Sequence, residues 1–100
     1  MDKQTALFTI ETRQGHHFSL HLDAHPSSGY KWKIVNYENS MLEFIKDEYN
    51  SNISGGIGTP GIQTFEFKAL KKGITTIEMN LKKPLETNGY EKEVFNVEIF

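Results

Sequence analysis

Residues 63–81 read QTFEFKALKKGITTIEMNL, and this stretch decides the fold class. Apolar residues alternate with polar ones on both sides of a short turn, Lys71-Lys72-Gly73. The alternating apolar residues are Phe65, Phe67, Ala69, Ile77, Met79 and Leu81. A period of two places such residues on one face of an extended chain. The stretch therefore predicts two β-strands, each with one buried face, separated by a tight turn.

The same period recurs in four further segments of the chain. Their alternating apolar residues are Ala6, Phe8, Ile10, Phe18, Leu20, Leu22, Tyr30, Trp32, Ile34, Phe95, Val97 and Ile99. Turn-forming sequences separate the segments, notably Arg13-Gln14-Gly15 and Asn88-Gly89. About seven short strands with regularly spaced turns predict an all-β fold, an immunoglobulin-like antiparallel β-sandwich. The length fits a single domain over residues 1–100.

Trp32 and the stretch from Met41 to Tyr49 are two local features of this sandwich. Trp32 lies in an alternating segment, and we expect it to be a core residue on a central strand. The stretch from Met41 to Tyr49 fits either a short helical turn or a strand with a bulge. The chain has no cysteine, so apolar packing must take the place of the immunoglobulin disulfide.

The composition excludes several classes of function. The 11 basic and 13 acidic residues leave a net charge of -2 with interspersed signs, which argues against a nucleic-acid partner. The lack of cysteine excludes a zinc–thiolate site and a thiol nucleophile. No apolar run approaches the ~20 residues that a membrane-spanning helix needs. We therefore expect no cofactor and no membrane partner.

The N-terminal residues MDKQTALFTI contain no apolar signal-peptide core. We expect either a protein made without a signal, and hence intracellular, or a mature form from which a signal was removed. The absence of cysteine is compatible with both compartments.

Three segments between the strands have compositions suited to binding. His25-Pro26-Ser27-Ser28-Gly29-Tyr30 combines a stiffening proline with two small hydroxyl residues at its apex. Gly58-Thr59-Pro60-Gly61 has small residues that let another backbone approach. In Lys83-Pro84-Leu85 the proline interrupts a strand end and projects Leu85 outward. Each segment alone also fits an ordinary turn, but in a seven-strand sandwich all three emerge at one end and form one surface.

In this order the three segments resemble the binding loops of the chagasin family of cysteine protease inhibitors. The family pattern is Asn-Pro-Thr-Thr-Gly-Tyr/Phe, then Gly-x-Gly-Gly, then Arg-Pro-Trp, on an immunoglobulin-like sandwich. The resemblance covers roughly residues 15–100, nearly a whole domain of this size. The departures from the pattern are His25 for Asn, Ser27 and Ser28 for Thr, Pro60 for Gly, Lys83 for Arg, and Leu85 for Trp.

The resemblance implies a reversible, competitive inhibitor of papain-like, cathepsin-type cysteine proteases, and not an enzyme. The first loop would cover the protease's Cys–His pair, with Ser27 and Ser28 nearest to it. The second would run along the unprimed side of the cleft, and the third would pack on the primed side with Leu85 in place of an aromatic residue. The expected partner is a papain-like cysteine protease, and the inhibitor itself is expected to be a monomer.

Two other functions are alternatives for this sequence. An immunoglobulin-like module could bind another protein or a glycan without inhibiting a protease. A glycan site needs an exposed aromatic platform, whereas most aromatic residues here alternate into the core. An enzyme could use Asp23, His25 and Ser27 or Ser28 as a hydrolase triad. No oxyanion site or nucleophile elbow accompanies them, so we do not expect catalysis.

A metal site at His16, His17 and His21 is not expected either. Neighbouring residues on a strand face opposite ways, which separates His16 from His17. His17 and His21 share a face but lie roughly 13 Å apart on strand geometry. Exposed polar side chains explain these histidines better than metal ligands.

Overall fold

The structure is a computed structural model that describes residues 4–24, 30–50, 61–82 and 91–100. These residues form seven β-strands and no α-helix, so they include no helix that could cross a membrane. The strands are β1 (Gln4–Thr12), β2 (His17–Ala24), β3 (Lys31–Tyr37), β4 (Leu42–Asn50), β5 (Gly61–Ala69), β6 (Gly73–Lys82) and β7 (Glu91–Ile99). The seven-strand prediction is confirmed.

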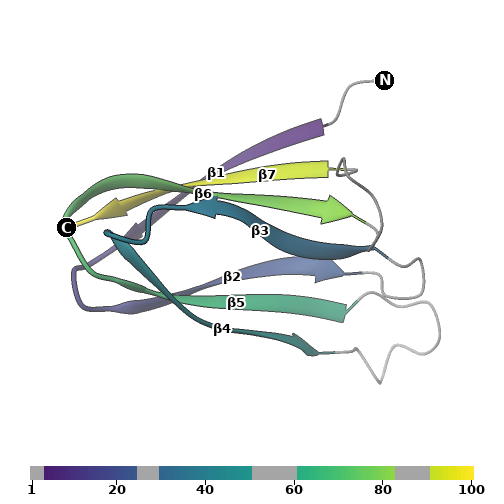
Figure 1. Cartoon of the computed structure of the whole chain (residues 1–100), viewed down its shortest axis with the longest axis horizontal. Helices are drawn as coiled ribbons and strands as arrows, with labels where there is room; N and C mark the ends of the chain where they lie inside the picture. Colours follow the sequence, from purple (N-terminus) through teal and green to yellow (C-terminus); the bar gives the residue numbers. More distant parts are fainter. Residues whose placement is uncertain (1–3, 25–29, 51–60, 83–90) are drawn as a thin grey trace.

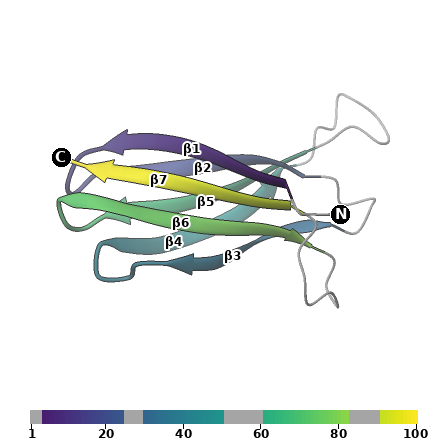
Figure 2. The ribbon, with the colours of Figure 1, turned by 90° about the horizontal axis from the view of Figure 1, so that it is seen from above.

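The strands form two facing sheets, as Figure 1 shows. One sheet has the order β1-β7-β6-β3 and the other the order β2-β5-β4. All neighbours are antiparallel except β1 and β7, which pair in parallel. Seen from above, β1 and β2 lie along one side of the sandwich, and β3 and β4 along the other (Figure 2). Each side of the sandwich is therefore bordered by one edge strand from each sheet.

The predicted period-two residues form the core between the sheets. The side chains of Phe65, Phe67, Ile77, Met79 and Val97 are fully buried. Tyr37 and Phe44 pack their rings on Phe67, with ring centroids 5.5 Å away in both pairs. The two alternating runs around the Lys71-Lys72-Gly73 turn belong to different sheets, because β5 and β6 lie in opposite layers. This turn therefore connects the layers and places both apolar faces against each other.

Trp32 corrects one expectation. Its side chain is buried, as predicted, but β3 is an edge strand of its sheet and not a central one. Alternation reports which face of a strand is covered, and it carries no information about the strand's neighbours. Burial at this edge comes from the opposite sheet, as the contacts described below show.

The ambiguous stretch from Met41 to Tyr49 is a strand with a bulge. β4 pairs with β5 along its length, and the register shifts between Phe44 and Lys46. The bulge moves Asp47 and Tyr49 onto the face of Phe65 and Gln63, the inward face of the sheet. A bulge breaks the two-residue period, which explains why the sequence of this segment fits two structures.

The end of the sandwich that carries the C-terminus is closed by backbone hydrogen bonds. The Gln14 amide donates to the Phe100 carbonyl at 2.8 Å, and the Phe100 amide donates to the Thr12 carbonyl at 2.9 Å. The Gly15 amide donates to the Ala69 carbonyl at 2.8 Å. Gly15 has a positive φ of 88°, which a side chain would disfavour at this turn. The predicted turn at residues 13–15 thus holds the two sheets together.

Candidate functional site

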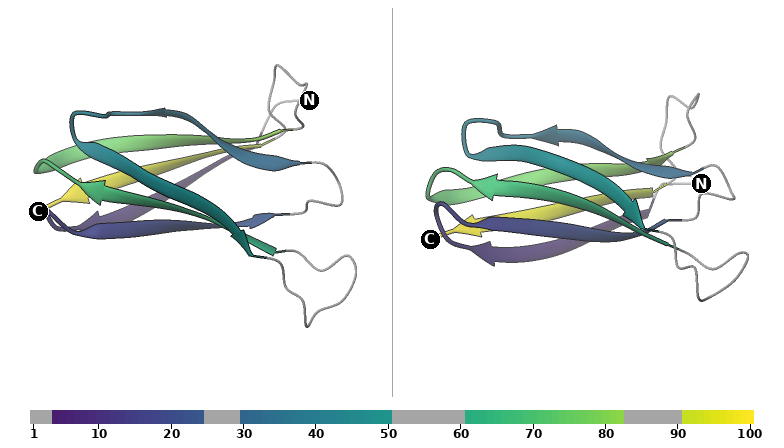
Figure 3. Two further views of the ribbon diagram at one scale, coloured as in Figure 1. Left: turned by 60° about the horizontal axis from the view of Figure 1, so that its bottom comes forward. Right: turned by 90° about the horizontal axis from the view of Figure 1, so that it is seen from below.

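The other end of the sandwich, opposite the C-terminus, holds the six strand ends that flank segments 25–29, 51–60 and 83–90, beside the start of β1 (Figure 3). In one sheet, Ala24 at the end of β2 pairs with Gly61 at the start of β5, and Asn50 at the end of β4 pairs with Ile62. In the other sheet, Lys31 pairs with Lys82, and Leu81 pairs with Glu91. The segments 25–29, 51–60 and 83–90 therefore all leave from, and return to, this one end.

Trp32 binds the two sheets together at this end. Its indole Nε1 donates to the Asp23 carbonyl at 2.9 Å. Its backbone amide donates to the Gln63 side-chain oxygen at 3.0 Å, and its carbonyl accepts from the Gln63 side-chain nitrogen at 3.0 Å. Asp23 precedes segment 25–29 and Trp32 follows it, so these bonds fix the spacing of both ends of that segment.

Gln63 is the functional residue that the sequence analysis missed. It is the one buried polar side chain among the described residues. Its side-chain amide makes the two hydrogen bonds to the open edge of β3 that the backbone of a neighbouring strand would make. A signal for it exists in the sequence. Gln63 occupies an inward position of the same alternation as Phe65 and Phe67, where an apolar residue is expected.

The structure describes only two of the predicted binding residues. Tyr30 is half-buried and packs against the core, and Gly61 is buried at the first position of β5. The other predicted residues lie outside the described part of the chain: His25, Pro26, Ser27, Ser28, Gly29, Gly58, Thr59, Pro60, Lys83, Pro84 and Leu85. What the structure supplies for them is the position of the strand ends on either side.

Gly61 has a structural reason to be a glycine. A Cβ atom there would lie 2.6 Å from the Asn50 carbonyl oxygen and also against the Tyr49 ring. We expect Gly61→Ala to destabilise the fold by about 1–3 kcal/mol, because β4 or Tyr49 must move. Urea unfolding measures this. In a Tyr49→Ala background the same change should cost less, and equal costs in both backgrounds would contradict the close contact.

The flank of this end bordered by β1 and β2 carries two inward-facing glutamates. Glu91 and Glu93 continue the inward row of Phe95 and Val97 on β7, where they are partly buried. Burial, the carboxylate of Glu91 and the carboxylate of Asp23 together raise the pKa of Glu93 above its ordinary value of 4.5. At this flank the inward-facing residues of β7 therefore change from apolar to acidic.

This shift makes stability depend on pH. Between pH 4.5 and the higher pKa of the folded state, Glu93 is protonated in the folded protein but ionised in the unfolded chain. The free energy of unfolding therefore falls as the pH rises through this range. We expect Glu93→Gln to make the free energy of unfolding less dependent on pH and to stabilise the protein at neutral pH. Denaturant unfolding at about pH 5 and about pH 8 measures both effects. Glu43→Gln, at an exposed position on β4, should leave the dependence of stability on pH unchanged, and an equal flattening there would contradict this assignment.

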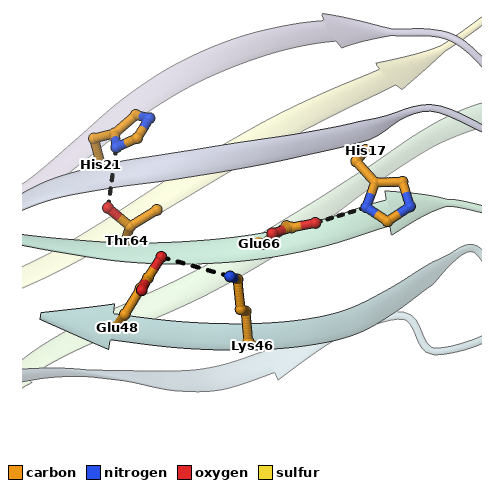
Figure 4. A network of polar contacts seen from close by, with 6 residues as sticks. All are labelled: His17, His21, Lys46, Glu48, Thr64 and Glu66. Atoms are coloured by element: carbon orange, nitrogen blue, oxygen red, sulfur yellow. Dashed lines mark hydrogen bonds and ion pairs between the residues drawn. The ribbon is translucent and has the colours of Figure 1, made fainter.

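Two of the histidines considered as metal ligands contact residues of the neighbouring strand β5. Figure 4 shows His17 and His21 on the outer face of β2, each directed at a residue of β5. His17 Nδ1 lies 2.6 Å from Glu66, and His21 Nδ1 lies 3.2 Å from the Thr64 hydroxyl. Within the described ranges no group of three or more histidine, aspartate or glutamate residues could hold a metal ion.

Known proteins share this architecture. A cysteine protease inhibitor from Entamoeba histolytica is 25% identical, with 98% of this chain and 97% of that one covered and a TM-score of 0.72. The Leishmania mexicana ICP is 23% identical over 100% of this chain and 91% of that one, with a TM-score of 0.62. PbICP-C, solved in complex with falcipain-2, is 13% identical over 98% and 91%, with a TM-score of 0.80.

No curated protein sequence matches this chain at a significant level. The family model described as "Chagasin family peptidase inhibitor I42" matches residues 11–99. That match covers β2 to β7 and the last two residues of β1, together with the three segments between the strand ends. The sequence resemblance, the sandwich fold and the expectation of an inhibitor and not an enzyme are thereby confirmed: this chain belongs to the chagasin family of peptidase inhibitors.

Proposed function

We propose that this protein inhibits papain-like cysteine proteases reversibly and competitively, by presenting segments 25–30, 58–61 and 83–85 to the active-site cleft. The observation that carries the proposal is the meeting of six strand ends at one end of a chagasin-family sandwich. A rigid frame lowers the entropy lost when loops are ordered on binding. The hydrogen bonds of Trp32 supply such a frame on both sides of the first loop.

Each loop has its own part in the proposed complex. Ser27 and Ser28 cover the protease's Cys–His pair without offering a cleavable bond in register. The loop from Gly58 to Gly61 runs along the unprimed side, where Pro60 removes one backbone donor. Lys83-Pro84-Leu85 packs on the primed side. The complex of PbICP-C with falcipain-2 supports a protease as the class of partner, because that protein shares this fold.

Steady-state kinetics test the proposal. The purified protein should inhibit papain and a cathepsin L-type enzyme competitively, and should leave trypsin unaffected. Trypsin is the control because its nucleophile is a serine in an unrelated cleft. No inhibition of either cysteine protease at micromolar protein would overturn the proposal, and binding of another protein or a glycan would then become the leading function.

Leu85→Trp tests the placement of the third loop. Tryptophan has a larger apolar surface than leucine and is enriched among residues that dominate interface energies. We expect the substitution to tighten inhibition of papain by about tenfold, which corresponds to about 1.4 kcal/mol. Leu70→Trp, at an exposed position near the C-terminal end of the sandwich, should leave the inhibition constant unchanged. Unchanged or weaker inhibition by Leu85→Trp would place the third loop outside the interface.

A further inference from the structure

Three lysines lie together on the outer face of the four-stranded sheet, next to the proposed protease-binding loops. β3 begins and β6 ends at this end of the sandwich (Figure 1). Lys31 and Lys82 pair directly across these strands, and Lys33 follows two residues along β3. The pair between them, Trp32 and Leu81, is buried between the sheets, so the lysine side chains point outward. Lys31, Lys33 and Lys82 form the lysine cluster.

Within the described ranges, no carboxylate neutralises the lysine cluster. None of the ion pairs that the described residues form includes one of its three members. Lys31 and Lys33 are exposed, and Lys82 is half-buried. Side chains that lie directly opposite each other on a sheet are about 5 Å apart at Cβ, and like charges there destabilise the pair. The pairing of Lys31 with Lys82 therefore costs the fold stability, and a partner with negative charge would offset that cost.

The other sheet carries the opposite charge at the same end of the sandwich. Its last two outward-facing rows are Asp23–Ile62–Asn50 and His21–Thr64–Glu48. These rows hold two carboxylates and no lysine or arginine. The proposed loops therefore leave the sandwich between a basic outer face on one sheet and an acidic outer face on the other. Such a distribution of charge orients an approaching charged surface relative to the loops.

We propose that the lysine cluster contacts carboxylates on the target protease, beside the primed side of its cleft. The inference rests on the proposed function, because Lys31 adjoins the first loop and Lys82 adjoins the third, which packs on the primed side. The target is therefore a papain-like protease with an acidic surface next to its primed subsites. Charges at the rim of an interface mainly raise the association rate and make it depend on salt, whereas dissociation depends on the buried contacts.

The association rate constant tests this choice of partner. Progress curves of inhibition give it for two papain-like proteases, one with carboxylates and one with lysines beside the primed subsites. We expect association with the acidic protease to slow by about tenfold between about 20 mM and about 200 mM NaCl. Association with the basic protease should be slower at low salt and should not fall as salt is added. The same salt dependence for both proteases would overturn the inference.

Two matched variants locate the effect. Lys31→Gln/Lys33→Gln/Lys82→Gln should slow association with the acidic protease by about tenfold at low salt and change its dissociation rate by less than about twofold. Lys68→Gln/Lys71→Gln/Lys72→Gln removes the same charge at the other end of the sandwich and should associate like the parent. An equal loss in both variants would show that net charge sets the rate, and would overturn the inference.

The outcomes distinguish this inference from the proposed function. Inhibition by the parent, with an unchanged association rate in the variant of the lysine cluster, overturns the inference alone. No inhibition of either protease overturns the proposed function and the inference together. The salt dependence of the parent needs no variant, so that comparison stands even if a substitution disturbs folding.

Discussion

Ser28→Arg should weaken inhibition of papain by about 100-fold or more, since loss of a central interface contact commonly costs 2 kcal/mol or more. In the proposed complex Ser28 lies at the narrow apex of the first loop, next to the protease's catalytic pair. Arginine places a long side chain and a buried charge where a small hydroxyl fits. Papain inhibition kinetics give the ratio of inhibition constants.

Ser40→Arg is the matched control. Ser40 is exposed in the turn between β3 and β4, at the end of the sandwich away from the six strand ends. The same substitution there should leave the inhibition constant unchanged, and both variants should keep the parent's melting temperature. If Ser28→Arg inhibits as well as Ser40→Arg, segment 25–30 is not at the centre of the interface.

Gln63→Leu should destabilise the fold by about 2–5 kcal/mol, the combined cost of leaving two buried backbone groups without partners. Leucine is similar in size to glutamine, so the cavity term is small. The loss comes from the Trp32 amide and carbonyl, which bond to the Gln63 side chain and which a leucine cannot satisfy. Urea unfolding followed by Trp32 fluorescence measures the difference. Weaker papain inhibition should accompany it, because the first loop loses its fixed base.

Thr64→Val is the control that tests whether any substitution in β5 destabilises the fold. Thr64 is the next residue of the strand, it faces outward and its hydroxyl contacts only His21 among the described side chains. Its replacement should cost under about 1 kcal/mol, as expected for an exposed hydrogen bond. A similar loss in both variants would show that Gln63 has no special role in joining the sheets.

The sequence predicted the strands and their buried faces because a period of two is a local property. The order of the strands is not local, and this explains the error over Trp32. Its alternation with Ile34 identified the buried face, while the edge position of β3 depends on pairing with β6 alone. The sequence did not decide between the bulge after Phe44 and a helical turn, because one added residue breaks the two-residue period by which a strand is identified.

The candidate site was predicted only in part. Turn composition and motif order identified the three segments, and the structure adds that their flanking strand ends meet at one end of the molecule. The polar residues that lie on the inward face at this end were missed. Gln63, Glu91 and Glu93 lie in inward rows that the alternation already defined, so extending each row by one or two positions would have found them. Their partners on other strands depend on tertiary pairing, which one sequence does not reveal.

The most direct test of whether this end of the sandwich binds the protease is a map of backbone amide chemical shifts on addition of papain. We expect the changes to concentrate in the segments between the six strand ends and at the strand ends themselves, which are Ala24, Lys31, Asn50, Gly61, Lys82 and Glu91. The amides of Gly15, Leu70 and Gly73, at the other end, should keep their shifts. Changes centred on that other end, or on the outer face of a sheet, would contradict the claim that this surface binds the protease.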